Sequence, residues 1–142
     1  MATLSLEKAN LIIVSALARS AESGYDPMAV VVLDAAGHVK AVQREDDATM
    51  FRVDVALGKA WGAVAFGVPS RVLAERAVTN PNFFVTLSTT ARGRLLPQPG
   101  AVLIRDGAGG AILGAVGASG GTGDQDEEIC GYGVTAAGFS VQ

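Results

Sequence analysis

A glycine-rich segment near the end of the chain is the first place where the sequence could do chemistry. Residues 117–123 read Gly-Ala-Ser-Gly-Gly-Thr-Gly, after an apolar run that predicts a strand and before a polar run that predicts a helix. Such a turn directs backbone N–H groups and the positive end of the helix at one point, which suits a carboxylate or a phosphate. No lysine follows the last glycine, and the pattern is not GxGxxG. We predict that Ser119, Gly120, Gly121 and Thr122 line a ligand pocket; the alternative is a tight turn that needs glycine only for its backbone.

Four acidic residues follow this segment directly: Asp124, Asp126, Glu127 and Glu128. Acidic side chains in the first turn of a helix stabilise it by about 0.3–1 kcal/mol each, and we favour this capping role. If the segment borders a pocket, Asp124 or Asp126 could instead act as a general base.

Lys59 lies in a markedly apolar segment, Ala56–Trp61. A partly buried amine can bind an anion or attack a carbonyl, whereas an isolated lysine on a helix is usually only solvated. Arg44, at the end of a predicted strand, could hold a carboxylate through two parallel hydrogen bonds. The sequence assigns no role to Arg92 and Arg94.

His38 is the only histidine, and it could ligate a haem iron. It follows Gly37 in a predicted hairpin turn, so we favour an exposed structural role. Cys130, the only cysteine, reads as a small buried core residue. The sequence has neither a CxxCH motif nor a His/Cys cluster typical of a zinc site. Weaker candidates for a haem ligand are Tyr25, Tyr132, Met28 and Met50.

The composition narrows the class of partner. The 142 residues include 14 acidic and 11 basic side chains, for a net charge of −3, and no basic face is apparent. Nucleic acid is therefore not an expected partner. We see no signal peptide and no apolar run long enough to cross a membrane, and we expect a cytoplasmic protein. Only 18 % of the residues are charged, against roughly 25 % in an average globular domain. We therefore expect a homo-oligomer, a dimer or larger, in a closed symmetric form.

Periodicity and breaker residues predict the elements that must position these side chains. We expect helices over 5–23, 50–66, 70–78 and 124–136, with a further short helix or turn beginning near Pro81. Strands are expected over 28–33, 39–44, 95–96, 102–105 and 111–117, with hairpins joining the first pair and the last pair. The order predicts one α+β domain over residues 1–142, with a single, mainly antiparallel sheet of about five strands flanked by helices.

Particular residues mark the element boundaries. Ser5 should cap the first helix, and Gly24 should end it. Ser70 should cap the short helix that follows Pro69. Gly58 and Gly62, four residues apart, indicate close packing of the second long helix rather than chemistry.

Four stretches together resemble the GlcG/HbpS family, which includes the C-terminal domain of PduO-type proteins. They are the opening helix, VVVLDAAGHVKAVQRED, VDVALGKAWGAVAFGVPS and PGAVLIRDGAGGAILGAVGASGGTGDQDEEI; residues 78–96 fit loosely. The resemblance implies a sheet of about five strands and assembly into dimers and larger closed oligomers. The family commonly has a lysine at the position of Lys59 and often a basic residue at that of Arg44, and it tolerates histidine at that of His38. Its branches are associated with haem binding, glycolate metabolism and cobalamin-dependent use of diols.

Three functions follow as hypotheses. The first is an oligomeric protein that binds a small anionic organic molecule, with haem as the named precedent and Arg44, Lys59 and Ser119–Thr122 as the binding residues. The second is a cofactor-independent isomerase, hydratase or lyase acting on a small carboxylic acid in catabolism. There Lys59 or Asp124 would be the acid–base group, and the glycine segment would hold an oxyanion. The third is a structural or regulatory partner of another protein.

Overall fold

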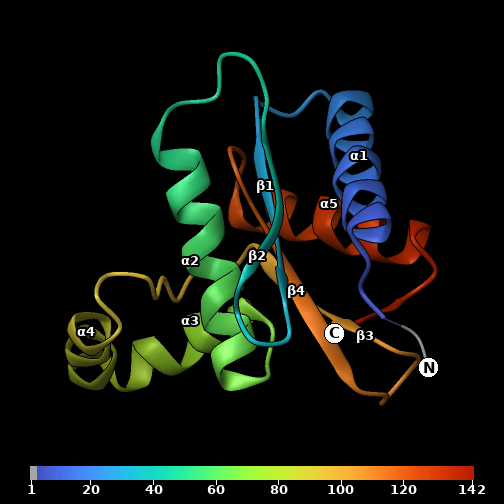
Figure 1. The fold of residues 1–142 in the computed structure, drawn as a ribbon. Helices are drawn as coiled ribbons and strands as arrows, with labels where there is room; N and C mark the ends of the chain where they lie inside the picture. The colour runs from blue at the N-terminus through green and yellow to red at the C-terminus, as the bar shows by residue number, and fades with distance from the viewer. Residues whose placement is uncertain (1–2) are drawn as a thin grey trace.

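Strand β1 (Ala29–Asp34) is buried along its apolar length because helices cover both faces of the sheet to which it belongs. The computed structural model describes residues 3–142 (Figure 1). β1 pairs with β2 (Val39–Arg44) and β4 (Ile112–Ser119), and β4 pairs in turn with β3 (Ala101–Arg105). β5 (Ser140–Val141) pairs with β3, which gives five antiparallel strands in the order β2-β1-β4-β3-β5. The predicted α+β class is confirmed.

Two core layers lie on opposite faces of this sheet. On one face, α1 (Leu6–Ser23) and α5 (Gly123–Ala136) enclose a cluster that includes Ile12, Val30 and Ile129. On the other face, α2 (Phe51–Phe66) covers a cluster that includes Val31 and Leu103. Val30 and Val31 therefore point to opposite faces, as successive strand residues do.

The first helix begins and ends where its sequence predicts. The Ser5 side chain accepts a hydrogen bond from the backbone of Lys8, and Gly24 ends the helix in the left-handed conformation, with φ of 70°. Glycine adopts this conformation without the steric cost of a Cβ atom.

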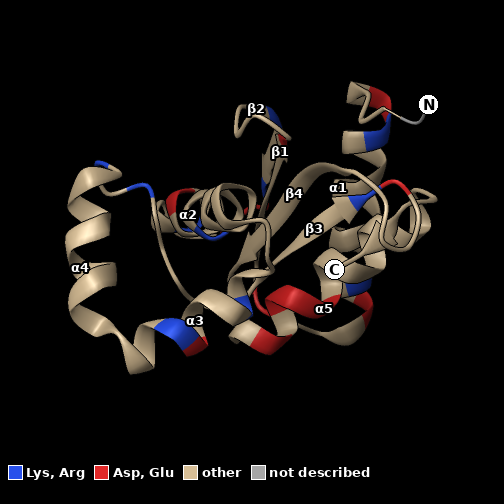
Figure 2. Ribbon diagram, turned by 90° about the horizontal axis from the view of Figure 1, so that it is seen from below, with Lys and Arg blue, Asp and Glu red and all other residues tan. Residues whose placement is uncertain are grey.

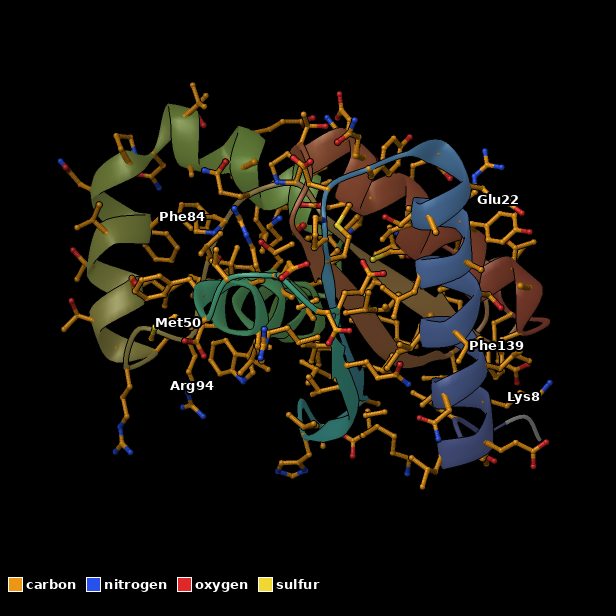
Figure 3. The ribbon with its side chains drawn as sticks, turned by 90° about the horizontal axis from the view of Figure 1, so that it is seen from above. Lys8, Glu22, Met50, Phe84, Arg94 and Phe139 are labelled. Atoms are coloured by element: carbon orange, nitrogen blue, oxygen red, sulfur yellow. The ribbon has the colours of Figure 1, made fainter. Side chains whose placement is uncertain are left out.

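Helices α3 (Ser70–Thr79) and α4 (Pro81–Thr90) extend away from the sheet (Figure 1). Phe84 points from α4 toward the body of the molecule (Figure 3), with its ring 6.0 Å from that of Phe66. A small third cluster, Leu73, Phe84, Ala91 and Leu95, holds this arm in place.

Two predictions about residues 70–99 are wrong. Leu95 and Leu96 form no strand; instead the backbone N–H of Leu96 donates to the carbonyl of Gly58, 3.3 Å away. Pro69 rather than Ser70 occupies the cap position of α3, and the Ser70 hydroxyl accepts from the backbone N–H of Ala101 at 2.9 Å.

The glycines of α2 do pack closely, as predicted. A Cβ at Gly58 would lie 2.8 Å from the Cβ of Leu96, and a Cβ at Gly62 would lie 2.7 Å from Leu95. The two glycines therefore let the 95–96 segment lie directly on the helix. Over residues 3–142, no helix combines the length and apolar character needed to cross a membrane.

Candidate functional site

The turn between β4 and α5 is built by a reciprocal cap. The Thr122 hydroxyl accepts from the backbone N–H of Gln125 at 3.1 Å, and the Gln125 side chain accepts from the backbone N–H of Thr122 at 3.0 Å. The backbone N–H of Gly121 donates to Oδ1 of Asp126 at 3.0 Å. Side chains of the protein therefore already use two of the backbone donors that the sequence assigned to a ligand.

Lys59 reaches this turn from α2 through the interior. Its side chain is only 6 % exposed, and its Nζ donates to Oδ2 of Asp126 at 2.8 Å and to the carbonyl of Ala118 at 3.0 Å. Gly100 makes room for it: a Cβ there would lie 2.6 Å from Nζ, and the glycine has φ of +134°. The lysine and Asp126 thus form a buried ion pair that ties α2 to the start of α5.

A cavity of about 460 Å³ lies against this ion pair, and we call it the Lys59 pocket. Arg52, Val55 and Lys59 line it from successive turns of α2, because residues three, four and seven apart share one face of a helix. The remaining walls come from the segment before β3 and from the turn that leads into α5: Leu96, Gln98, Pro99, Ser119, Gly121, Thr122, Gly123, Asp124 and Asp126.

Most of the charged side chains that line this pocket form ion pairs. Lys59 is paired with Asp126, and Asp124 is paired with Arg71, which also contacts Glu127. The hydrogen bond to Asp124 is the main reason that the pKa of Arg71 is raised. Acidic residues are concentrated along α5 (Figure 2).

Arg52 is the exception among the charged residues that line the pocket. It forms no ion pair within the described part of the chain, and its Nη1 lies 3.4 Å from the Ser119 hydroxyl. Arg52 is therefore the pocket cation that remains available to a ligand.

The structure brings together most of the residues that the sequence singled out. Lys59, Ser119, Gly121, Thr122 and Asp124 all line the Lys59 pocket.

Gly120 and Arg44 lie elsewhere. A Cβ at Gly120 would lie 2.9 Å from the Cα of Met28, outside the pocket lining. Arg44 lines a different cavity, and its Nη1 donates to the carbonyl of Ala48 at 2.6 Å. The structure therefore offers no shared carboxylate clamp between Arg44 and Lys59.

The candidate iron ligands are widely separated. The His38 side chain is 81 % exposed in the hairpin turn, with its Nδ1 4.0 Å from Oδ1 of Asp34. Cys130 is fully buried, as predicted, and burial raises the pKa of its thiol. Tyr132 lines a third cavity of about 770 Å³ between α3 and α5, with apolar walls that include Val72 and Val102. No group of three or more His, Cys, Asp or Glu side chains within residues 3–142 could hold a metal ion.

Sequence reasoning missed Arg52 and the pairing of Lys59 with Asp126. The position of Arg52 was open to inference, because it precedes Lys59 by seven residues in a predicted helix and so shares its face. The pairing of Lys59 with Asp126 could not be inferred, because nothing in the sequence places the start of α5 beside the middle of α2.

The sequence and the fold are both similar to those of known proteins. The family described as haem degrading protein HbpS-like matches residues 4–135. The chain belongs to the HbpS-like family. No curated protein matches it.

Solved structures share the fold of this HbpS-like chain. A crystal structure of a PduOC:heme complex is 24 % identical, with a TM-score of 0.85 and 98 % of each chain covered. A double mutant of HbpS from Streptomyces reticuli is 26 % identical, with a TM-score of 0.80, over 95 % of this chain and 87 % of that one. The protein ORFY from Klebsiella pneumoniae is 24 % identical, with a TM-score of 0.83, over 96 % and 92 % of the two chains. The predicted family is thereby confirmed.

Proposed function

We propose that this HbpS-like protein binds a small organic anion in the Lys59 pocket and holds its carboxylate against Arg52. The observation that carries the proposal is the guanidinium of Arg52, which has no ion pair within residues 3–142 and lies beside the Ser119 hydroxyl. The lysine and the two carboxylates of the same pocket are already paired. A guanidinium presents two parallel N–H donors to a carboxylate, and a hydroxyl beside it can donate a third hydrogen bond.

The start of α5 supports the same ligand class. The first backbone N–H groups of a helix have no partner within the helix. The backbone N–H groups of Gly121 and Thr122, just before α5, donate to side chains. Those of Gly123 and Asp124, the first two residues of α5 and also in the pocket lining, have no acceptor among residues 3–142. They would therefore stabilise a bound carboxylate oxygen together with the helix dipole.

Calorimetric titration with two- to four-carbon carboxylates tests this proposal, preceded by native mass spectrometry of the freshly purified protein for any co-purified acid. Arg52→Gln should weaken binding by about tenfold or more, since hydrogen bonds to charged groups contribute about 1.5–3 kcal/mol. Arg76→Gln, which removes an exposed charge outside the pocket, is the matched control. Equal binding by both variants would refute the role of Arg52.

Haem is a second candidate ligand, favoured by the description of the family and by the PduOC:heme neighbour. The Lys59 pocket does not fit an axially ligated haem, because no His, Met, Cys or Tyr lines it. The cavity at Tyr132 fits better: it is larger, has apolar walls, and contributes a phenol, which is a known haem ligand.

If haem binds at Tyr132, Tyr132→Phe should change the Soret and charge-transfer bands of the titrated protein. His38→Ala should change neither, because His38 lies on the exposed hairpin turn. The opposite pattern would assign the iron to His38, and loss in neither variant would exclude both side chains as ligands.

The enzymatic alternative uses the same pocket. Asp126 and Ala118 hold Nζ of Lys59, and Asp124 is held by Arg71. A cofactor-independent reaction on a small carboxylic acid would therefore require one of these pairs to open. Turnover of the titrated acids that is lost in Lys59→Ala or Asp124→Asn, with the fold retained, would establish this activity.

We propose further that the protein is a homo-oligomer. Helix α4 has no charged residue (Figure 2), and Val85 and Phe83 on it are 71 % and 48 % exposed. A second copy covering this arm would remove apolar surface from water. Light scattering should give more than one chain per particle, and Val85→Glu should reduce that number. We also propose a cytoplasmic location, which suits the free thiol of Cys130.

A further inference from the structure

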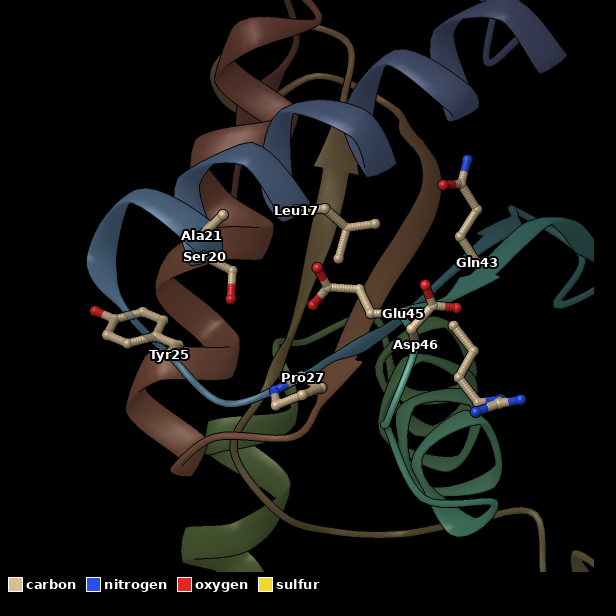
Figure 4. A pocket seen from close by; sticks show the side chains of 9 residues that line it. Leu17, Ser20, Ala21, Tyr25, Pro27, Gln43, Glu45 and Asp46 are labelled. Atoms are coloured by element: carbon tan, nitrogen blue, oxygen red, sulfur yellow. The ribbon is translucent and has the colours of Figure 1, made fainter.

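A polar cavity of about 500 Å³ lies where the end of α1 meets the end of β2 (Figure 4). We call it the Ser20 cavity. It shares no lining residue with the Lys59 pocket, so its role is independent of the function proposed above. Its walls are Leu17, Ser20, Ala21, Tyr25, Pro27, Gln43, Arg44, Glu45 and Asp46.

Ser20 is the buried polar group of this cavity. The residue is only 1 % exposed, yet its hydroxyl has no hydrogen-bond partner among residues 3–142. A serine in a helix often donates to the carbonyl four residues earlier, but no such bond to Ala16 occurs here. No fully buried side-chain nitrogen or oxygen within residues 3–142 lacks a partner, so the Ser20 hydroxyl is open to the cavity, where it can bond to water or to a ligand.

Glu45 adds an acceptor of full negative charge. Its Oε1 accepts from the backbone N–H of Met28 at 2.9 Å, which fixes the side chain, whereas Oε2 has no partner within the described part of the chain. Figure 4 shows the Glu45 carboxylate and the Ser20 hydroxyl projecting into the same space, between Leu17 and Pro27.

Two donors of the lining have partners outside the cavity. Nη1 of Arg44 donates to Ala48, and the side chain is exposed. The Tyr25 hydroxyl donates to Glu128 at 3.4 Å, on the side away from Glu45. Glu45 and Asp46 in the lining are acceptors only, and the Ser20 hydroxyl can accept as well.

We propose that the Ser20 cavity binds a protonated primary amine. The ammonium group donates to Oε2 of Glu45 and to the hydroxyl oxygen of Ser20, and Asp46 at the cavity rim adds a second negative charge. The alkyl part of the ligand lies against the apolar side chains of Leu17 and Pro27. An ammonium group with three donors fits this set of acceptors, whereas a carboxylate would meet two negative charges.

Titration of the ¹⁵N-labelled protein with n-butylamine hydrochloride tests the proposal. The backbone signals of Ser20, Met28 and Glu45 should shift and saturate in the millimolar range, with butan-1-ol and potassium chloride as uncharged and ionic-strength controls. Glu45→Gln should weaken binding about tenfold, because it keeps an acceptor for Met28 but removes the charge. Ser20→Ala should weaken it several-fold without disturbing the fold.

Glu22→Gln is the matched control, since it removes one exposed negative charge from α1 outside the cavity lining and should leave the affinity unchanged. Three results would overturn the proposal: shifts that never saturate, equal shifts with potassium chloride or butan-1-ol, or equal affinity in Glu45→Gln and Glu22→Gln.

Discussion

The ion pair between Lys59 and Asp126 should be the most sensitive polar contact in the fold. Both side chains are almost fully buried, 6 % and 2 % exposed, so neither charge can turn to water when its partner is removed. Lys59→Met leaves the Asp126 carboxylate with only the backbone N–H of Gly121 as a donor, and Asp126→Asn leaves the ammonium with the Ala118 carbonyl. Breaking a buried pair by removing one partner costs about 3–5 kcal/mol.

For a chain of this size, that loss should lower Tm by about 6–20 °C. Urea unfolding at fixed protein concentration, followed by far-UV circular dichroism, measures the free energy of unfolding directly. The double variant Lys59→Met/Asp126→Leu should recover most of the loss, because an apolar pair of similar volume leaves no uncompensated charge. Arg19→Met, which breaks a half-exposed pair with Glu128, should cost no more than about 1 kcal/mol. A loss below about 1 kcal/mol in Lys59→Met, or a double variant no more stable than the worse single one, would refute the reasoning.

Three further outcomes are expected. Gly100→Ala should lower the urea midpoint more than Gly138→Ala does, because both glycines have positive φ but only a Cβ at Gly100 meets the buried lysine; equal losses would argue against this contact. The pKa of Asp34 lies below its ordinary value of 3.8, chiefly because the backbone N–H of His38 donates to its carboxylate. Its contribution to stability is therefore present above that pH and lost in stronger acid, so urea midpoints measured from pH 6 to pH 2.5 should fall more steeply in the wild type than in Asp34→Asn. Finally, the raised pKa of the buried Cys130 thiol should make it inert to a disulfide reagent until urea unfolds the chain, and rapid labelling of the native protein would contradict its burial.

Local signals in the sequence were sufficient for most elements. The run Met28–Leu33, the turn at Gly37 and the caps at Ser5 and Gly24 act over a few residues, so the first hairpin and α1 were predicted nearly to the residue. The number of strands also agrees with the prediction, although one predicted strand is absent and a different one completes the sheet. The segment Leu95–Leu96 is not a strand, and the fifth strand is the short β5, whose two residues carry too little pattern to be predicted.

The candidate site was harder to predict, because its parts meet only through the tertiary fold. The glycine-rich turn and Lys59 were each noticed for their own chemistry, and both line one pocket. Their use of Asp126 and the Gly121 backbone N–H depends on where α5 lies relative to α2, and neither periodicity nor capping encodes that position. Arg44 looked equally suitable, but its strand ends beside a different cavity.

The pairing of β1 with β4 affects how the chain can be synthesised. β1 is separated from β2 only by a short hairpin turn. Its other neighbour, β4, is distant in the sequence, since Ala29 pairs with Ser119. During translation, this apolar strand therefore remains exposed along one edge and over much of its surface until β4 leaves the ribosome. Contacts this distant along the chain slow folding, so the yield of folded protein should depend on chaperones that protect this strand and on the speed with which the last third of the chain is made.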